Sequence, residues 1–150
     1  MKKYLGIIFA LIVIFAVTGC EKVNEGKYKE GTYYGYVIDN YGGAENVATA
    51  VLYVDSNGLI KSVFLDTVYT KDGVNTTKKS LGNDYGMKAR SEAGKEWYEQ
   101  VELLEKKVVE NQGTSFITIN DEGKTDAVAG VTMKVDALYK ALNKALEQAK

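Results

Sequence analysis

The sequence predicts an α+β fold: an antiparallel sheet, opened by a hairpin, that packs with two amphipathic helices. Three observations support this prediction. Asn57-Gly58 separates two stretches of strand-forming residues, which is typical of a tight β-hairpin. Two later segments, 91–110 and 135–149, carry apolar residues at helical spacing. Strands and helices also do not alternate strictly along the chain, as they would in a doubly wound parallel sheet.

The expected strands occupy the first half of the chain. Residues 32–38 are rich in Tyr, Val and Ile, which favour extended structure, and a loop is expected over residues 39–46. Strand 47–55 and its partner 59–66 then form the hairpin, because Asn-Gly accepts the positive φ angles of a tight turn. Residues 68–90 are polar and contain three glycines. We expect a long connection there, and such connections are often functional in small domains.

The second half is expected to be mainly helical. Between residues 91 and 110 the apolar side chains fall three or four positions apart: Trp97, Val101, Leu104 and Val108. This stripe predicts a helix, with Trp97 in the core. A short strand is expected at 116–119, a turn at 120–123 and a second amphipathic helix at 135–149.

The first twenty residues are similar to the export signal of a bacterial lipoprotein. Lys2 and Lys3 precede an uncharged, mostly apolar run that ends at Gly19. This run is too short for a comfortable transmembrane helix, which needs about 20 apolar residues. Val17-Thr18-Gly19-Cys20 resembles the lipobox that lipoprotein signal peptidase recognises.

Cys20 is the only cysteine of the chain, which excludes an intramolecular disulfide, and it lies too close to the signal to be a buried thiol. We therefore expect residues 1–19 to be removed and Cys20 to carry a diacylglyceryl anchor, which holds a protein at a membrane almost irreversibly. Residues 20–30 are expected to form a lipidated tether and residues 31–150 a single domain, on the outer face of the bacterial cell membrane.

The composition excludes several kinds of chemistry. Removal of residues 1–19 leaves 131 of the 150 residues and, because Lys2 and Lys3 are lost, changes the formal charge from −1 to −3. An acidic chain is a poor partner for nucleic acid. With no histidine and one cysteine, ordinary zinc, haem or copper sites and Ser-His-Asp catalysis are not expected. Chemistry must therefore come from a bound organic cofactor or from carboxylates, Lys and Tyr.

Residues 126–134, directly before the last expected helix, have the best features for binding a ligand. Gly130 lets the backbone approach a ligand closely, and the Thr132 hydroxyl lies near a helix N-terminus, where a phosphate is favoured. The same residues are compatible with a simple turn in which Thr132 caps the helix. Both interpretations are open on these residues alone.

This segment resembles the signature of FMN-binding domains, roughly Asp-x-x-Ser/Thr-Gly-Ala-Thr. Such domains occur in flavinylated subunits of Na⁺-pumping quinone reductases and Rnf-type complexes, and in lipoproteins of extracellular electron transfer. Asp126, Gly130 and Thr132 match the signature, whereas Ala129 and Val131 stand where Ser or Thr and Ala are usual. The resemblance implies that a flavin transferase esterifies the phosphate of FMN onto Thr132.

The resemblance covers residues 28–150. Within it, residues 78–87, Lys-Lys-Ser-Leu-Gly-Asn-Asp-Tyr-Gly-Met, look like those of a lipoprotein branch of the family. In one interpretation, Tyr85-Gly86-Met87 lies beside the flavin ring, while Lys78 or Lys79 neutralises phosphate. In the other, this is a solvated loop whose Tyr85 and Met87 pack into the core.

The function implied by the resemblance is that of an electron carrier without substrate turnover, which receives electrons from a membrane donor such as a quinol oxidoreductase. The alternative is a cofactor-free or noncovalent ligand-binding surface lipoprotein on the same scaffold, motivated by Ala129, Val131 and Lys134. A hydrolase would have to use Asp84, Asp121 or Glu122, which lie in expected turns, where acidic residues are common.

Overall fold

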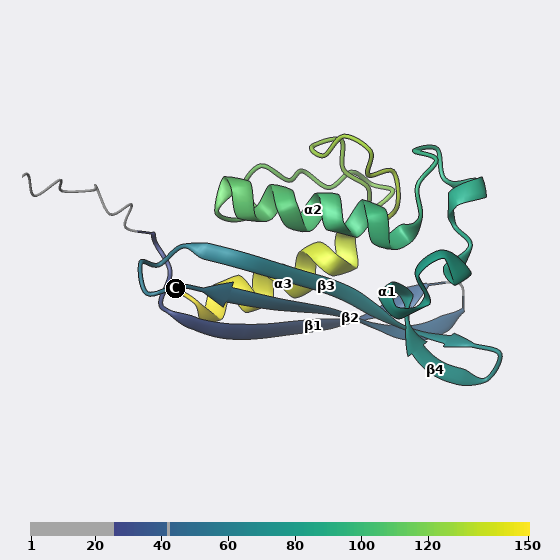
Figure 1. The fold of residues 1–150 in the computed structure, drawn as a ribbon, viewed down its shortest axis with the longest axis horizontal. Helices are drawn as coiled ribbons and strands as arrows, with labels where there is room; N and C mark the ends of the chain where they lie inside the picture. The colour runs from purple at the N-terminus through teal and green to yellow at the C-terminus, as the bar shows by residue number, and fades with distance from the viewer. Residues whose placement is uncertain (1–25, 42) are drawn as a thin grey trace, which may run out of the picture.

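A computed structural model describes residues 26–41 and 43–150 of the 150-residue chain. The expected signal peptide, Cys20 and the first part of the tether lie outside these residues. The predicted α+β class is confirmed: a four-stranded antiparallel sheet in the order β1-β2-β3-β4 packs with helices (Figure 1). Within the described ranges, none of the helices has the length and apolar character needed to cross a membrane.

The sheet is longer than the sequence predicts. β1 spans Gly31–Tyr41 and β2 spans Ala44–Val54, so most of the expected loop 39–46 is strand. β2 pairs with β3, Ile60–Lys71, around the predicted Asn57-Gly58 turn, with a bulge at Tyr53/Val54. The register places Val37 opposite Ala48, and Ala48 opposite Thr67.

The expected long connection at 68–90 is wrong in its first half. β3 continues to Lys71, turns at Asp72-Gly73 and pairs with β4, Val74–Thr77. Asp72 and Gly73 have φ angles of 52° and 79°, the positive values that a two-residue hairpin turn requires. Three short helical segments follow: α1 (Lys78–Leu81), η1 (Gly82–Tyr85) and η2 (Lys88–Arg90).

Both predicted long helices are present with shifted ends. α2 spans Trp97–Asn111 and begins with a capping box between Glu96 and Glu99. α3 spans Asp136–Gln148. The expected strand at 116–119 is wrong. This segment forms no ladder with the sheet, and Ile117 is its only buried residue.

The core lies between one face of the sheet and the helices. α3 packs on β1 and β2, whereas α2 packs on β3. Gly35 is required at the β1–α3 contact, because a Cβ atom there would collide with the backbone oxygen of Ala141. Helix side chains also bond backbone groups on the outer sides of β1 and β3: Gln148 Nε2 donates to Tyr34 O at 2.7 Å, and Glu105 Oε1 accepts from Leu65 N at 2.6 Å.

The end of the expected tether belongs to the folded domain. The N–H of Gly26 donates to Asn57 O at 2.6 Å, and the N–H of Tyr28 donates to Gly58 O at 3.3 Å. Tyr28 is buried, and Lys29 N–H donates to Ala149 O. The chain therefore enters the sheet beside the β2–β3 turn, at the end opposite α1 and β4 (Figure 1).

Candidate functional site

A pocket of about 260 Å³ lies between the end of the sheet, α1, and the N-terminal ends of α2 and α3. It is lined by Asp39, Thr67, Lys78, Tyr85, Met87, Arg90, Ser91, Glu92, Trp97, Lys124, Thr132, Met133, Lys134, Asp136, Ala137 and Leu138. Four of the residues expected to bind a cofactor, from two distant parts of the sequence, are therefore brought together: Lys78, Tyr85, Met87 and Thr132.

Thr132 lies in the pocket wall, and the interpretation of it as a helix cap is wrong. The N-cap of α3 is Val135, and no side chain caps this helix. The Thr132 hydroxyl has no hydrogen-bond partner among the described residues. In the same residues, every buried side-chain polar atom has a partner, so an unpaired hydroxyl must be accessible. Thr132 is half-buried in the pocket wall, and its hydroxyl is therefore available to a ligand there. Ala137 and Leu138, in the first turn of α3, also line the pocket, where helix N–H groups lack intrahelical acceptors.

Gln100 of α2 holds the backbone at Thr132. Its side chain is fully buried, and Oε1 accepts from Thr132 N at 2.8 Å and from Met133 N at 3.2 Å. Its Nε2 donates to Ser91 Oγ at 2.8 Å and to Lys95 O at 3.3 Å. All four hydrogen bonds keep the amide satisfied while they tie the segment of Thr132 to α2. The sequence analysis missed Gln100, although a polar residue on the apolar stripe between Trp97 and Leu104 signals a buried partner.

The aromatic wall is built from η1 and the start of α2. Tyr85 packs edge-on against Trp97, with ring centroids 6.4 Å apart, and against Tyr69 at 5.3 Å. Trp97 is a core residue, as predicted, and it also lines the pocket. The backbone N–H of Met87 donates to Glu96 Oε2 at 2.8 Å, and this bond holds Met87 beside α2. Tyr85 and Met87 therefore pack against the core, as the second interpretation of residues 78–87 expects, and they also line the pocket. The place of a flavin ring beside them stays a prediction.

Lys78 supplies a buried positive charge to the pocket. Its Nζ lies 5.5 Å from the ring centroid of Tyr85 and 5.4 Å from that of Trp97, within cation–π range. Burial lowers the pKa of Lys78 below its usual value, while the negative charges of Asp39 and Asp66 act in the opposite direction. A partly desolvated cation beside aromatic rings favours an anionic or electron-rich ligand.

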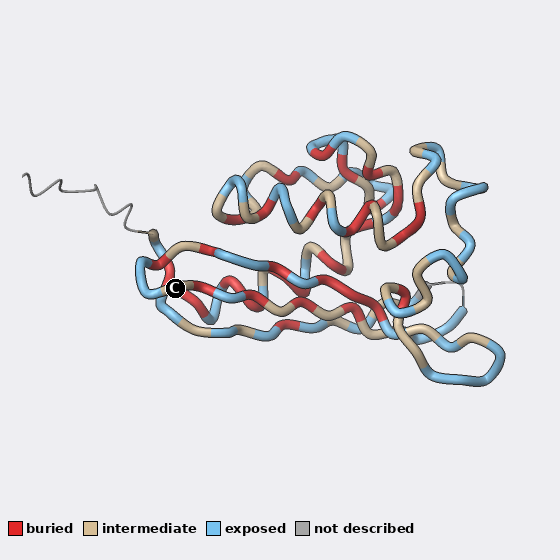
Figure 2. Tube along the Cα trace, in the orientation of Figure 1, coloured by how far each residue is buried: buried red, intermediate tan, exposed pale blue. Residues whose placement is uncertain are grey.

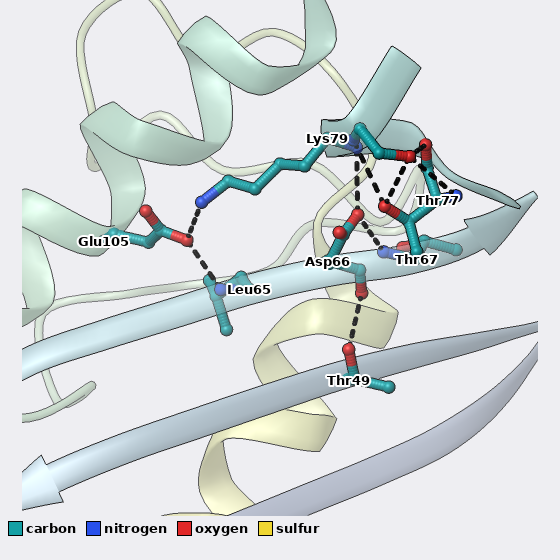
Figure 3. Close-up of polar contacts among 8 residues, drawn as sticks. Thr49, Leu65, Asp66, Thr67, Thr77, Lys79 and Glu105 are labelled. Atoms are coloured by element: carbon teal, nitrogen blue, oxygen red, sulfur yellow. Dashed lines mark hydrogen bonds and ion pairs between the residues drawn. The ribbon is translucent and has the colours of Figure 1, made fainter. Parts of the chain in front are cut away.

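Asp66 of β3 fixes α1, and with it Lys78 (Figure 3). Its buried Oδ1 accepts from Thr67 N at 2.8 Å and from Lys79 N at 3.0 Å, so the carboxylate compensates the N-terminal end of α1. Thr77 caps the same helix through Ser80 N. Lys79 does not line the pocket; its Nζ bonds Glu105 Oε1 at 2.6 Å (Figure 3).

The remaining predicted residues lie outside the pocket. Asp126 is exposed and lines a second pocket with Thr118, Asn120, Lys124 and Ala127, of which Lys124 also lines the first. Gly130 has a φ angle of 82° and turns the chain toward Thr132, and Gly86, at 71°, ends η1.

The two signature positions at which the chain departs from the family pattern are also outside the pocket. Ala129 is exposed, and Val131 is buried in the core. Asp84, Asp121 and Glu122, the carboxylates of the hydrolase alternative, are exposed and do not line the pocket.

The fold and the sequence together are similar to a solved structure. The chain is 31% identical to a protein from Clostridium thermocellum with a solution NMR structure, and the match covers 80% of this chain and 91% of that one, with a TM-score of 0.54. The two proteins belong to one family. No protein-family model matches the sequence, and no curated protein does either. The family relationship and the fold are therefore established.

Proposed function

We propose that this protein is a membrane-anchored, extracytoplasmic lipoprotein that binds FMN, esterified through its phosphate to Thr132, and that carries electrons. One observation carries the proposal: the accessible, unpaired Thr132 hydroxyl shares one pocket with the aromatic side chains of Tyr85 and Trp97 and the buried cation of Lys78. The anchor would be attached to Cys20, and a flavin transferase would load the cofactor.

The pocket's chemistry and size are compatible with part of a flavin nucleotide. Pockets that enclose a whole small-molecule ligand measure about 300–1,000 Å³. At about 260 Å³ this one is slightly smaller, so a ligand as large as FMN would extend beyond it. The lining combines aromatic and thioether surface for a ring system with a hydroxyl and cations for a phosphate, and this donor set fits FMN.

Several residues in and behind the pocket have distinct roles in this proposal. A bound flavin supplies one- and two-electron redox chemistry, while the protein supplies attachment, orientation and electrostatics. Gln100 holds the Thr132 backbone so that the hydroxyl stays in the pocket wall. Tyr85, Trp97 and Met87 offer apolar surface, and Lys78 offers positive charge. The first turn of α3 adds N–H groups that favour a phosphate.

The positions of the two departures from the signature support attachment at Thr132. A larger residue at position 131 does not narrow the pocket, because Val131 packs into the core. A hydroxyl at position 129 would not line the pocket, because Ala129 is exposed outside it. Neither substitution therefore removes a group that the pocket uses.

The proposal is tested by co-expression with a flavin transferase and intact-mass measurement of the purified, denatured protein. The wild type is expected to gain the mass of FMN less one water, Thr132→Ser to retain this increment, and Thr132→Ala to lose it. Thr118→Ala, which removes an exposed threonine outside the pocket, is the matched control and should retain it.

Two results would contradict covalent attachment. FMN that co-purifies with Thr132→Ala and is released on denaturation, with no mass increment in the wild type, would favour the noncovalent ligand-binding alternative. Absence of flavin absorbance from every variant would refute FMN binding as a whole.

A further inference from the structure

The face of the sheet opposite the helices is apolar, aromatic and uncovered. Its most exposed large side chains keep between 43% and 55% of their surface accessible: Tyr34, Tyr36, Ile38, Tyr53 and Phe64. We call these five residues, from β1, β2 and β3, the open face. Figure 2 shows the alternation of buried and exposed positions along the strands that produces it.

The open face is continuous across the strands. The register aligns Tyr34, Val51 and Phe64 in one row, and Tyr34 stacks on Tyr36 with ring centroids 6.0 Å apart. The neighbouring outward positions Thr49 and Ser62 are uncharged. Asp66 is an outward position by alternation, but its carboxylate turns to the backbone of α1 and it is only 5% exposed. Lys79 Nζ lies 4.2 Å from the ring centroid of Phe64, but it is largely buried and paired with Glu105. Apart from this paired cation, the row of Tyr34, Val51 and Phe64 presents no charge.

The size of the open face argues against a stable dimer. An aromatic side chain buries about 150–250 Å² when fully covered, so these half-exposed residues offer roughly 500 Å² together. From these five residues alone, two copies face to face would bury about 1,000 Å², which is below the about 1,200–2,000 Å² of stable protein interfaces. A patch of this size is nevertheless at the upper end of what monomers expose, and such patches often mark a binding surface.

The connection to Cys20 favours a membrane as the occupant. Gly26 is fixed beside Asn57 at one end of the open face. Six Cα–Cα steps separate Cys20 from Gly26, which limits their distance to about 21 Å. A lipidated Cys20 therefore holds this end of the sheet next to the bilayer.

The residue types also suit the bilayer interface. Tyrosine is enriched at membrane interfaces, where its ring is apolar and its hydroxyl stays hydrated. Lys144 lies at the edge of the face beside β1, where its Nζ donates to Tyr36 O at 3.1 Å and lies 5.7 Å from the ring centroid of Tyr36, so a positive charge borders the aromatic patch. By contrast, the rim of the pocket carries Arg90, Glu92 and Lys134, which suit a soluble protein partner better.

We infer that the open face rests on the lipid bilayer interface, so that the domain lies along the membrane with its helices outward. This inference rests on the proposed lipid anchor, but it does not depend on FMN. The pocket lies at the end of the sheet away from Gly26, roughly 26 Å along β1. If the domain stood upright, the pocket would be held away from the bilayer. In the flat orientation it lies about one sheet thickness, roughly 10 Å, above the lipid, within reach of a membrane electron donor.

The test uses the lipidated mature protein, which begins at Cys20, in nanodiscs of zwitterionic phosphatidylcholine. Because the lipid anchor occupies the thiol of Cys20, an introduced cysteine is the only free thiol and can carry a fluorophore. Ser62→Cys places the label on the open face, and Ser115→Cys, also an exposed serine, places it on the connection after α2 as the matched control. We expect a spin-labelled lipid to quench the label about threefold more at position 62 than at position 115.

Each other outcome overturns the inference in a recognisable way. Equal quenching at both positions means that the open face does not touch lipid. Disulfide cross-linking between the introduced thiols of Ser62→Cys in two copies means that a second copy covers the face. Intact mass of the same samples reports acyl chains and FMN separately. Missing acyl chains would therefore identify failure of the anchor, whereas missing FMN leaves the quenching result valid and contradicts only the flavin proposal.

As a second measurement, quenching at position 62 should fall when Tyr36→Ser and Phe64→Ser are added together, because both changes remove apolar surface from the face. It should change little between low and high salt, since the contact has no unpaired charge at its centre. Quenching that disappears at high salt would instead indicate an electrostatic association and would refute the proposed contact.

Discussion

Replacing Gln100 with methionine should destabilise the fold and release the segment of Thr132. Methionine has nearly the volume of glutamine, so the change leaves little cavity. It removes the oxygen that accepts from Thr132 N at 2.8 Å and from Met133 N at 3.2 Å. Of these two donors, Met133 is buried and Thr132 half-buried, so water replaces the lost acceptor poorly.

The expected loss follows from these two donors. A buried hydrogen-bonding group without a partner costs about 1–3 kcal/mol. The half-exposed N–H of Thr132 belongs at the lower end of that range, so the two together give about 2–4 kcal/mol. Native domains are stable by only about 5–15 kcal/mol, so Gln100→Met should remove a large part of the total.

Urea unfolding followed by the fluorescence of Trp97, the only tryptophan, measures the loss. Hydrogen exchange at Thr132 and Met133 should also become faster. Gln112→Met is the matched control: its amide bonds the backbone of Ile60 at 2.7 and 2.9 Å, at the other end of α2, so it should cost stability without altering flavin attachment. A loss below about 1 kcal/mol in Gln100→Met, with unchanged exchange, would refute the role assigned to Gln100.

Two further predictions concern buried charges. Burial lowers the pKa of Lys78 from 10.5, so the unfolded chain binds its proton more tightly, and the free energy of unfolding should rise as pH increases through the folded pKa. Lys78→Met should abolish this rise in urea unfolding between about pH 7 and 10; parallel profiles would contradict the assignment. Burial also raises the pKa of Glu105, against the hydrogen bond from Lys79, so Lys79→Met should cost about 3–5 kcal/mol at pH 7 and less at pH 5, where Glu105 binds a proton more readily. Lys107→Met, which breaks an equally short 2.6 Å but exposed ion pair, should leave the urea midpoint unchanged, and equal losses in the two variants would show that burial is irrelevant.

Local signals in the sequence were sufficient for the largest elements. The hairpin could be predicted from Asn57-Gly58, because the positive φ angle of the turn and the alternation of its two strands depend on residues that are close in sequence. The helices follow from apolar spacing, and the shift of the α2 start from Ser91 to Trp97 reflects the Glu96–Glu99 capping box. The β3–β4 hairpin was missed although Asp72-Gly73 is a similar signal, because most flanking residues are polar and none of residues 70–75 is fully buried.

Long-range packing determined what could not be predicted. The residues at 116–119 look like a strand because Phe, Ile and Thr favour extended structure, but Phe116, Ile117 and Ile119 pack against the core without any strand partner. Thr132 was predicted by family resemblance, whereas its open hydroxyl depends on Gln100, which is 32 residues away in sequence. Whether Val131 faced the pocket or the core could be decided only from the folded arrangement.

The bonded outer edge of β1 would have a further consequence if the proposed lipid anchor concentrates the protein on a membrane. Gln148 and Lys144 occupy the carbonyl oxygens of Tyr34 and Tyr36 along the outer edge of β1. A lipid anchor confines many copies to two dimensions, where any free edge would act as a template for strand addition by the next molecule. With these carbonyls already bonded, crowding brings copies together without offering a ladder to extend. Under the proposed anchor, helix α3 would thus hinder strand addition at this edge between neighbouring copies.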